Sequence, residues 1–385
     1  MLLRPVPGAG RVALVTLFGI GGDHDPQGRS GLAHFVEHLH VTAAAGTTPA
    51  RTYGELVKRY AGQANAQTGF RYTVVAQVFP KGGLHAEILD AAARMRDLKI
   101  TQADVDRERP RVLTELANMY ERMSALAAAN HARLLVRPTA SGGRHGGTPA
   151  DVERMTLLEL RAFHAKYYKP RNAILVLVGE FDNGDARAAI EKAFANVPAG
   201  EAPPAPAHVA LEVPQQVVRR PGPAAAPMVC LAFRAPAWDD DDFPAFLVLM
   251  MRLRAAGARW APFDDPDVVY LQGPVRSDES DAQAAARLQG QVDLAATRKA
   301  DAMEGFSAIN TYGFWYGLTP VPDIAARNNL YGVAFALGRR AQLGVDGERL
   351  KKAFGNLSPD KIQAAAQAIF DPKRRSAVVV RQRKE

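Results

Sequence analysis

The chain has 385 residues, of which 47% are hydrophobic and 23% are charged, an ordinary globular composition with enough length for two or more domains. The formal charge of +8 does not indicate a nucleic-acid partner, because the basic residues are scattered and interrupted by acidic stretches such as "WDDDDF". The single cysteine, Cys230, excludes a disulfide framework and any multi-cysteine zinc or iron–sulfur site, so a metal must be held by histidine and carboxylate side chains.

The sequence contains no segment typical of membrane insertion or export. No run reaches the roughly 18 apolar residues that span a bilayer, and the first residues lack a basic start followed by a cleavage site. We therefore expect a soluble protein without a membrane partner, in the cytoplasm or in a bacterial periplasm. The abrupt start leaves a missing leader open.

The predicted elements of the first half alternate irregularly between strands and helices. They are a strand over 11–20, helices over 31–41 and 50–61, a strand over 71–79, a helix over 84–97, a long helical region over 102–135, a helix over 156–168 and a strand over 173–181. Irregular alternation predicts an α+β fold rather than a doubly wound sheet.

A proline-rich stretch divides the chain into two predicted domains. Residues 196–227 have no sustained helical period, which is typical of an extended linker. We therefore predict one α/β domain over residues 1–195 and another over residues 228–385.

The ends of the two halves resemble each other. Segments 155–179 and 357–381 both read as a helix that starts after a hydroxyl residue, Thr156 or Ser358, then a proline, then an apolar strand. Such endings are common, so chance is the alternative, but the match favours a duplicated domain. Only the first copy carries a histidine cluster.

That cluster is the stretch "HFVEH", with His34, Glu37 and His38 in a segment of helical character. A spacing of four puts the two imidazoles one turn apart on one helical face, where both can bind a single ion. Zinc is commonly bound by such a pair, and this order of histidines and glutamate is an inverted zincin motif. His40 falls off the ligand face. The alternative is a helix with solvated histidines.

A third ligand must come from another element, and the best candidates lie in the helical region that starts at residue 102. Glu108 and Glu115 are seven residues apart, close to two helical turns, so they project from nearly the same face. Glu115 could complete the metal site while Glu108 orients a ligand histidine. Without the histidines, each would read as an exposed charge on an amphipathic helix. Pro110 lies between them and should kink the helix.

Taken together, "HFVEH" and the downstream glutamate of "VLTEL" resemble the pitrilysin and mitochondrial processing peptidase family of zinc metallopeptidases. The resemblance implies one Zn²⁺ per chain, bound by His34, His38 and Glu115, with Glu37 as general base and Glu108 behind a ligand histidine. It also implies two homologous α/β sandwich domains that form half of a clamshell. The activity implied is zinc-dependent hydrolysis of peptides or small unfolded proteins inside a closed chamber.

The stretch "ANAQT" resembles the family's edge strand, beside which an extended substrate adds by main-chain pairing. Asn65 and Ala66 are therefore our candidate substrate-binding residues in the first half. An asparagine turn beside a buried strand is the alternative.

The second half departs from the family pattern. Active members carry an arginine seven residues before a tyrosine that helps hold the substrate. The tyrosine position corresponds to Tyr270, another candidate substrate-binding residue, but the residue seven before it is Phe263. Either the registration is wrong, the chain is impaired, or a homologous partner supplies the pair. We favour the third explanation, which implies a heterodimer rather than a homodimer.

Two functions follow from these observations. The intact set of His34, Glu37, His38 and Glu115 indicates a zinc metalloendopeptidase subunit. The missing arginine keeps open a non-catalytic binding or assembly subunit of the same fold.

Overall fold

The computed structural model describes residues 1–138, 146–203, 217–222, 226–298 and 303–382. Contacts divide the chain into two compact units. The first comprises Met1–Leu113, His145–Ala207 and Pro320–Gly344, and the second comprises Thr114–Arg144, His208–Thr319 and Val345–Glu385. Part of the predicted linker, residues 196–227, lies outside the described residues, and the domain boundaries at 195 and 228 stay predictions.

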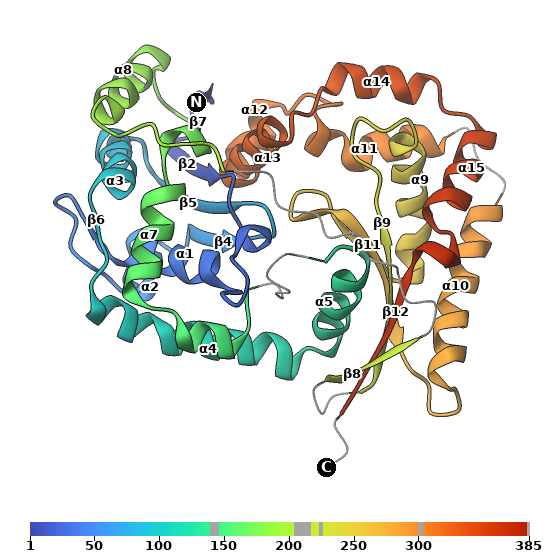
Figure 1. Cartoon of the computed structure of the whole chain (residues 1–385). Coiled ribbons are helices and arrows are strands. Elements are labelled where there is room, and N and C mark those ends of the chain that lie inside the picture. The colour runs from blue at the N-terminus through green and yellow to red at the C-terminus, as the bar shows by residue number, and fades with distance from the viewer. Residues whose placement is uncertain (139–145, 204–216, 223–225, 299–302, 383–385) are drawn as a thin grey trace. The chain divides into compact units, whose positions relative to one another are not determined.

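The first unit is built on a five-stranded sheet with the order β1-β7-β2-β5-β4 (Figure 1). Its strands are β1 (Leu2–Pro5), β2 (Arg11–Phe18), β4 (Ala64–Thr68), β5 (Thr73–Pro80) and β7 (Ala173–Gly179), and the short β3 (Ala44–Ala45) and β6 (Leu98–Lys99) pair separately. Its helices are α1 (Leu32–Thr42), α2 (Tyr53–Arg59), α3 (Leu84–Arg96), α6 (Pro149–Arg154), α7 (Leu157–Tyr167), α8 (Asn183–Phe194), α12 (Asp323–Asn328) and α13 (Leu330–Leu343). Strand β4 forms one edge of the sheet, as predicted.

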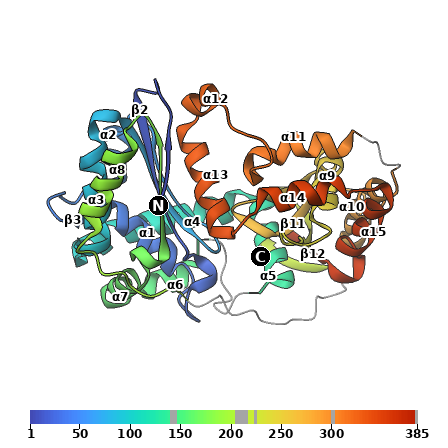
Figure 2. The ribbon, with the colours of Figure 1, turned by 90° about the horizontal axis from the view of Figure 1, so that it is seen from above.

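Helices cover both faces of this sheet, with α1 and α3 on one side and α13 on the other (Figure 2). Every residue of β2 from Val12 to Phe18 is buried, which explains why its sequence is continuously apolar rather than alternating. On the α1 side, the ring of Phe18 packs against the rings of His40 and Tyr168. On the other side, α13 lies so close that a Cβ on Gly338 would be 2.1 Å from Cδ1 of Leu17.

The second unit repeats this plan with a five-stranded sheet in the order β10-β11-β9-β12-β8. Its strands are β8 (Val218–Gly222), β9 (Met228–Arg234), β10 (Ala258–Ala261), β11 (Asp265–Pro274) and β12 (Ser376–Gln382). Its helices are α5 (Ser124–Val136), α9 (Phe243–Leu253), α10 (Asp281–Thr297), α11 (Glu304–Tyr316), α14 (Gly347–Gly355) and α15 (Pro359–Ile369).

The two sheets share one topology, which confirms the predicted duplication. In the first, β1 runs parallel to β7, and β7, β2, β5 and β4 follow as antiparallel neighbours. In the second, β8 runs parallel to β12, and β12, β9, β11 and β10 follow in the same way. The matching helix and strand, α7 with β7 and α15 with β12, are the segments that resemble each other in sequence.

Each unit includes helices from the other half of the chain: α5 belongs to the second unit, and α12 and α13 belong to the first. Helix α5 comes from the first half, and its residues Ala128, Ala132 and Val136 pack against β9 and β12 in the core of the second unit. Helix α13 comes from the second half and packs on β2 and β7 of the first unit. The compact units are therefore not continuous in sequence.

The predicted helical region over 102–135 is helical in the structure, but it is divided into two helices. It consists of α4 (Gln102–Arg122) and α5, separated at Met123, whose backbone angles of φ −120° and ψ 83° are not helical. Beyond the break, α5 packs on β9 and β12 of the second sheet. Helix α4 continues through Pro110 and crosses the division between the units. None of the described helices is long and apolar enough to cross a membrane.

Candidate metal centre

The start of helix α1 is held by Asp25 and a glycine. The N-cap residue Gly31 has a φ of 96°, and a Cβ there would lie 2.7 Å from the carbonyl oxygen of Gly146, so only glycine fits. Because glycine has no capping side chain, the carboxylate of Asp25 accepts hydrogen bonds from the backbone N–H groups of Gly31 at 2.6 Å and Ala33 at 2.8 Å. Burial raises the pKa of Asp25 to about 7, although both N–H groups favour its charged form.

Two of the three histidines of α1, His34 and His38, each turn one ring nitrogen toward an acceptor. Nδ1 of His34 lies 3.1 Å from the carbonyl oxygen of Gly146, and Nδ1 of His38 lies 3.5 Å from Oε2 of Glu108. A neutral imidazole that keeps its proton on Nδ1 for such an acceptor has its lone pair on Nε2. Both rings are therefore set to present Nε2 to a metal, and their centroids are 4.9 Å apart.

Glu115 brings the third donor. Possible ligand atoms of His34, His38 and Glu115 all lie within 4.8 Å of one another. Their exposure increases from the buried His34 through the half-buried His38 to the exposed Glu115, so the group is reachable from solvent on the glutamate side. Two imidazoles and one carboxylate form a donor set that suits zinc and leaves a fourth position for water. The structure thus brings together the three residues predicted as ligands.

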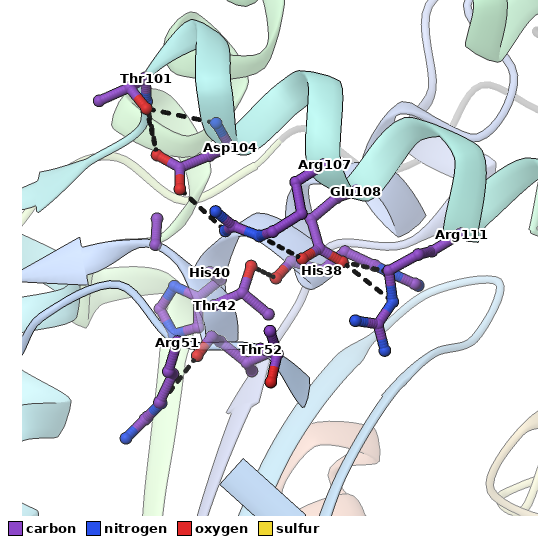
Figure 3. Close-up of polar contacts among 12 residues, drawn as sticks. His38, His40, Thr42, Arg51, Thr52, Thr101, Asp104, Arg107, Glu108 and Arg111 are labelled. Atoms are coloured by element: carbon purple, nitrogen blue, oxygen red, sulfur yellow. Dashed lines mark hydrogen bonds and ion pairs between the residues drawn. The ribbon is translucent and has the colours of Figure 1, made fainter. Parts of the chain in front are cut away.

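Glu108 lies on the same helix as Glu115. Figure 3 shows its carboxylate near His38, Arg107 and Arg111. Its side chain is completely buried and contacts three basic groups, Nδ1 of His38 at 3.5 Å, Nε of Arg107 at 3.1 Å and Nε of Arg111 at 3.6 Å. Burial alone would raise its pKa, but the hydrogen bonds and charges of these neighbours outweigh burial and hold the pKa below its usual value. Glu108 is therefore a buried carboxylate that contacts a candidate ligand histidine, despite the proline two positions later.

Glu37 lies next to the histidines and is oriented by the edge strand. Glu37 is 6% exposed. Its Oε2 accepts a hydrogen bond of 2.9 Å from Oγ1 of Thr68, the last residue of β4. Thr68 is the threonine of the "ANAQT" stretch, but its contact with Glu37 was not predicted. The edge strand therefore ends at the candidate general base.

Asn65 and Ala66 lie on β4, as predicted, with Asn65 exposed and Ala66 half-buried. They pair with Ala76 and Val75 of β5, so their other backbone edge borders no strand of the described sheet. The side-chain amide of Asn65 donates a long hydrogen bond of 3.4 Å to the hydroxyl of Tyr331 on α13.

Tyr270 lies on β11 in the second unit, where its hydroxyl donates a hydrogen bond of 2.5 Å to the buried carboxylate of Asp265. The same carboxylate pairs with Arg133 at 3.1 Å. Burial raises the pKa of Asp265 to about 6. Phe263, at the position where the resemblance calls for arginine, is buried and packs its ring 5.4 Å from that of Trp315.

His40 is not part of the metal group. Its Nδ1 lies 3.1 Å from Nε2 of the buried His164. The ring of His164 stacks on that of Tyr168, and the ring of His40 is tilted against it. Burial lowers the pKa of both histidines, that of His164 to about 3. Sequence reasoning excluded His40 from the ligands but missed this partner, and it also missed the roles of Asp25 and Gly146 in setting α1 and His34.

Two family models match the sequence. One, described as insulinase (peptidase family M16), covers residues 2–140, which include all three candidate ligands and Glu37. The other, described as the peptidase M16 inactive domain, covers residues 154–260. The chain belongs to peptidase family M16. The inactive-domain match begins after the last candidate ligand.

Several M16 relatives are named zinc proteases. Zinc protease PqqE of Helicobacter pylori is 27% identical over 187 residues, which cover 45% of this chain and 39% of the relative. Probable zinc protease PqqL of Escherichia coli is 25% identical over 178 residues, which cover 45% of this chain and 19% of the relative. The aligned stretches thus span less than half of either relative.

Solved M16 structures match nearly the whole chain. A protease from Helicobacter pylori aligns with a TM-score of 0.76 and 18% identity, over 99% of this chain and 95% of that chain. The M16 inactive domain from Pseudomonas fluorescens aligns with a TM-score of 0.75 and 14% identity over the same shares. The first half of the periplasmic protease PqqL from Escherichia coli covers 99% of this chain and 89% of that chain, with a TM-score of 0.69 and 17% identity. These likenesses confirm the predicted fold of two duplicated α/β domains.

Proposed function

We propose that this chain is the zinc-bearing subunit of an M16 endopeptidase that hydrolyses peptides or small unfolded proteins within a closed chamber. The observation that carries the proposal is the group of His34, His38 and Glu115, whose possible ligand atoms lie within 4.8 Å of one another. Glu37 precedes His38 in the same helix. The donor types fit zinc, and the Nδ1 contact of each histidine favours Nε2 as the ligand atom.

His34, His38 and Glu115 would hold the ion. When bound, zinc polarises a scissile carbonyl and lowers the pKa of a water molecule toward 7. Glu37 accepts the proton of the attacking water and passes it to the leaving amine. Thr68 donates to Oε2 of Glu37 and so keeps the carboxylate oriented during both transfers. Glu108 holds the Nδ1 side of His38, which keeps that ring in one orientation.

The substrate adds as a strand along β4. Main-chain pairing tolerates many sequences and suits an extended or unfolded chain. Asn65 and Ala66 lie along this edge, and Thr68 at its end contacts Glu37, so a strand paired there runs past the base. This proposal assigns substrate binding to the backbone of Asn65 and Ala66.

A homologous partner supplies the arginine and tyrosine pair. Position 263 carries a buried phenylalanine that packs against Trp315, so this chain has no arginine side chain to offer there. The hydroxyl of Tyr270 already donates to Asp265 within its own unit. We therefore propose a heterodimer in preference to a homodimer. By likeness to the periplasmic PqqL, a bacterial periplasm is one of its two candidate compartments beside the cytoplasm.

The test measures bound zinc by mass spectrometry and cleavage of quenched fluorescent peptides, for the chain alone and mixed with a homologous M16 chain that carries the arginine and tyrosine pair. We expect one zinc per chain, and cleavage chiefly in the mixture. The Glu37→Gln variant should keep the metal but lose turnover. Strong cleavage by the chain alone would refute the partner, and cleavage by Glu37→Gln would refute the base.

A non-catalytic binding or assembly subunit is the second candidate. The match of residues 154–260 to the M16 inactive domain and the phenylalanine at position 263 favour it. Under this alternative, zinc binds but no peptide is cleaved with or without the partner chain. The same pair of measurements therefore separates the two functions.

A further inference from the structure

A cavity of about 540 Å³ opens in the first unit beside the start of β4. Its lining includes Arg11 and Ala76 from the sheet, Asn65 from the edge strand, and Arg327 and Tyr331 where α12 meets α13. The cavity therefore adjoins the edge along which we propose that substrate adds.

The strand register assigns this cavity to the α13 face of the sheet. Asn65 pairs with Ala76, and Ala76 pairs with Val15 of β2, so these side chains share one face. Leu17, two residues from Val15 and thus on the same face, lies against Gly338 of α13. Glu37 instead meets the side chain of Thr68, three residues from Asn65 and on the opposite face.

The lining of the cavity is positively charged. Arg11 and Arg327 are its charged residues, and none of the described residues that line it is acidic. Within the described ranges, neither arginine forms an ion pair within 4.0 Å of a carboxylate, although the charge of Arg327 helps to lower the pKa of Glu180, and Arg327 is exposed. Asn65 and Tyr331 add polar side chains to the lining.

We infer that this cavity binds acidic side chains of an extended peptide paired with β4, an inference that rests on the proposed substrate strand. Guanidinium groups bind carboxylates through paired, charge-assisted hydrogen bonds. From Thr68 to Asn65 the strand advances about 10 Å, so the acidic residue lies about three to five residues from the bond beside Glu37. Only alternate side chains of a paired strand face α13, so the preference recurs at every second position.

The volume and place of the cavity favour an internal acidic residue over a terminal carboxylate. The cavity is lined by the four consecutive residues from Gly62 to Asn65, and about 540 Å³ exceeds the space that one carboxylate fills. The occupant is therefore a side chain of Asp or Glu within a continuous peptide.

The test uses the full chain, with its partner chain if cleavage needs one, and an extended peptide in which a single glutamate moves one position at a time. The peptide has an amidated C-terminus in one series and a free one in the other. We expect KM to fall about three- to tenfold when glutamate occupies alternate positions on one side of the cleaved bond, the size of one or two exposed arginine–carboxylate pairs. The amidated series should behave identically.

The variant Arg327→Glu should remove this preference and favour lysine at the same positions. Arg187→Glu on α8 is the matched control, since it makes the same charge change at an exposed residue outside the cavity lining and should retain the preference. Equal KM for glutamate and glutamine at every position, the same peptide profile for both variants, or a preference that vanishes on amidation would overturn the inference.

Binding separates this inference from the proposed function. Fluorescence anisotropy of the same peptides on Glu37→Gln chain requires no turnover. If the affinity depends on glutamate and Arg327→Glu removes this dependence, the inference is supported. This holds even if the wild type cleaves no peptide, in which case only the proposed catalysis is wrong. Cleavage without any dependence on acidic residues leaves catalysis standing and overturns the cavity's role.

Discussion

Replacing Glu108 by glutamine tests how the metal centre is supported from behind. The change keeps the side chain's shape and removes its charge at a position with no solvent exposure. His38 then faces a neutral amide across 3.5 Å instead of a carboxylate. An amide can turn either its oxygen or its NH₂ group toward Nδ1, so the ring orientation that presents Nε2 is less strongly favoured.

The structure sets the expected magnitudes. Loss of a carboxylate behind a ligand histidine weakens metal binding about 10- to 100-fold, or about 1.4 to 2.7 kcal/mol. The folded chain also loses a charged acceptor for Arg107 and Arg111, whose side chains are 32% and 42% exposed and can be solvated instead. Arg107 keeps its pair with Asp104 at 2.8 Å. We therefore expect unfolding to become easier by only about 1 to 2 kcal/mol.

The assay is zinc titration against a fluorescent chelator, combined with urea denaturation of the metal-free protein. Glu87→Gln is the matched control, because Glu87 is also a buried glutamate and accepts hydrogen bonds from Arg59 at 2.8 Å and Tyr60 at 2.6 Å, but none of its described contacts involves a candidate ligand. It should lower stability by a similar amount and leave zinc affinity unchanged. If Glu108→Gln binds zinc as tightly as the wild type, the supporting role of Glu108 is wrong.

Three further substitutions test the start of α1, the packing of α13 on the sheet and the buried His164. Asp25→Ala removes the acceptor at the start of α1 and should lower the free energy of unfolding by about 1 to 2 kcal/mol in urea, whereas an unchanged midpoint contradicts the capping role. Gly338→Val forces a branched side chain against Leu17 and should cost about 1 to 3 kcal/mol, so a wild-type melting temperature speaks against the close approach of α13. Burial lowers the pKa of His164 from 6.5 to about 3, so this residue binds a proton more readily in the unfolded chain. The contribution of His164 to stability is full above about pH 6.5 and falls by about 1.4 kcal/mol per pH unit below it. His164→Gln should flatten this slope in urea denaturation between neutral and mildly acidic pH, and equal slopes for both proteins would count against the buried neutral ring.

Much of the metal centre could be predicted from the sequence because its geometry is local. Four residues of helix bring His34 and His38 to one face, and seven bring Glu108 and Glu115 to another, whatever the rest of the chain does. The helix and strand that end each half follow from equally local signals, a hydroxyl at the N-cap and a proline after the helix. For these elements, the period of the backbone is sufficient.

Contacts between distant segments required the tertiary structure. The hydrogen bond from Thr68 to Glu37 joins residues 31 apart, and the carbonyl of Gly146 meets His34 across 112 residues. Neither group carries a distinctive local signal, since a backbone carbonyl is present at every position. The sequence could not indicate that the edge strand itself orients the base.

The exchange of helices between the units was also decided by tertiary packing. The sequence pattern over 102–135 is helical throughout. The helix breaks at Met123, which is neither a proline nor a glycine, the two residues that most often mark such a break. An apolar helical face predicts that the helix packs against another element, but it does not indicate which sheet that element belongs to. Helix α13 joins the first sheet because Gly338 allows a close fit against β2. Helix α5 joins the second sheet because its small residues pack against β9 and β12.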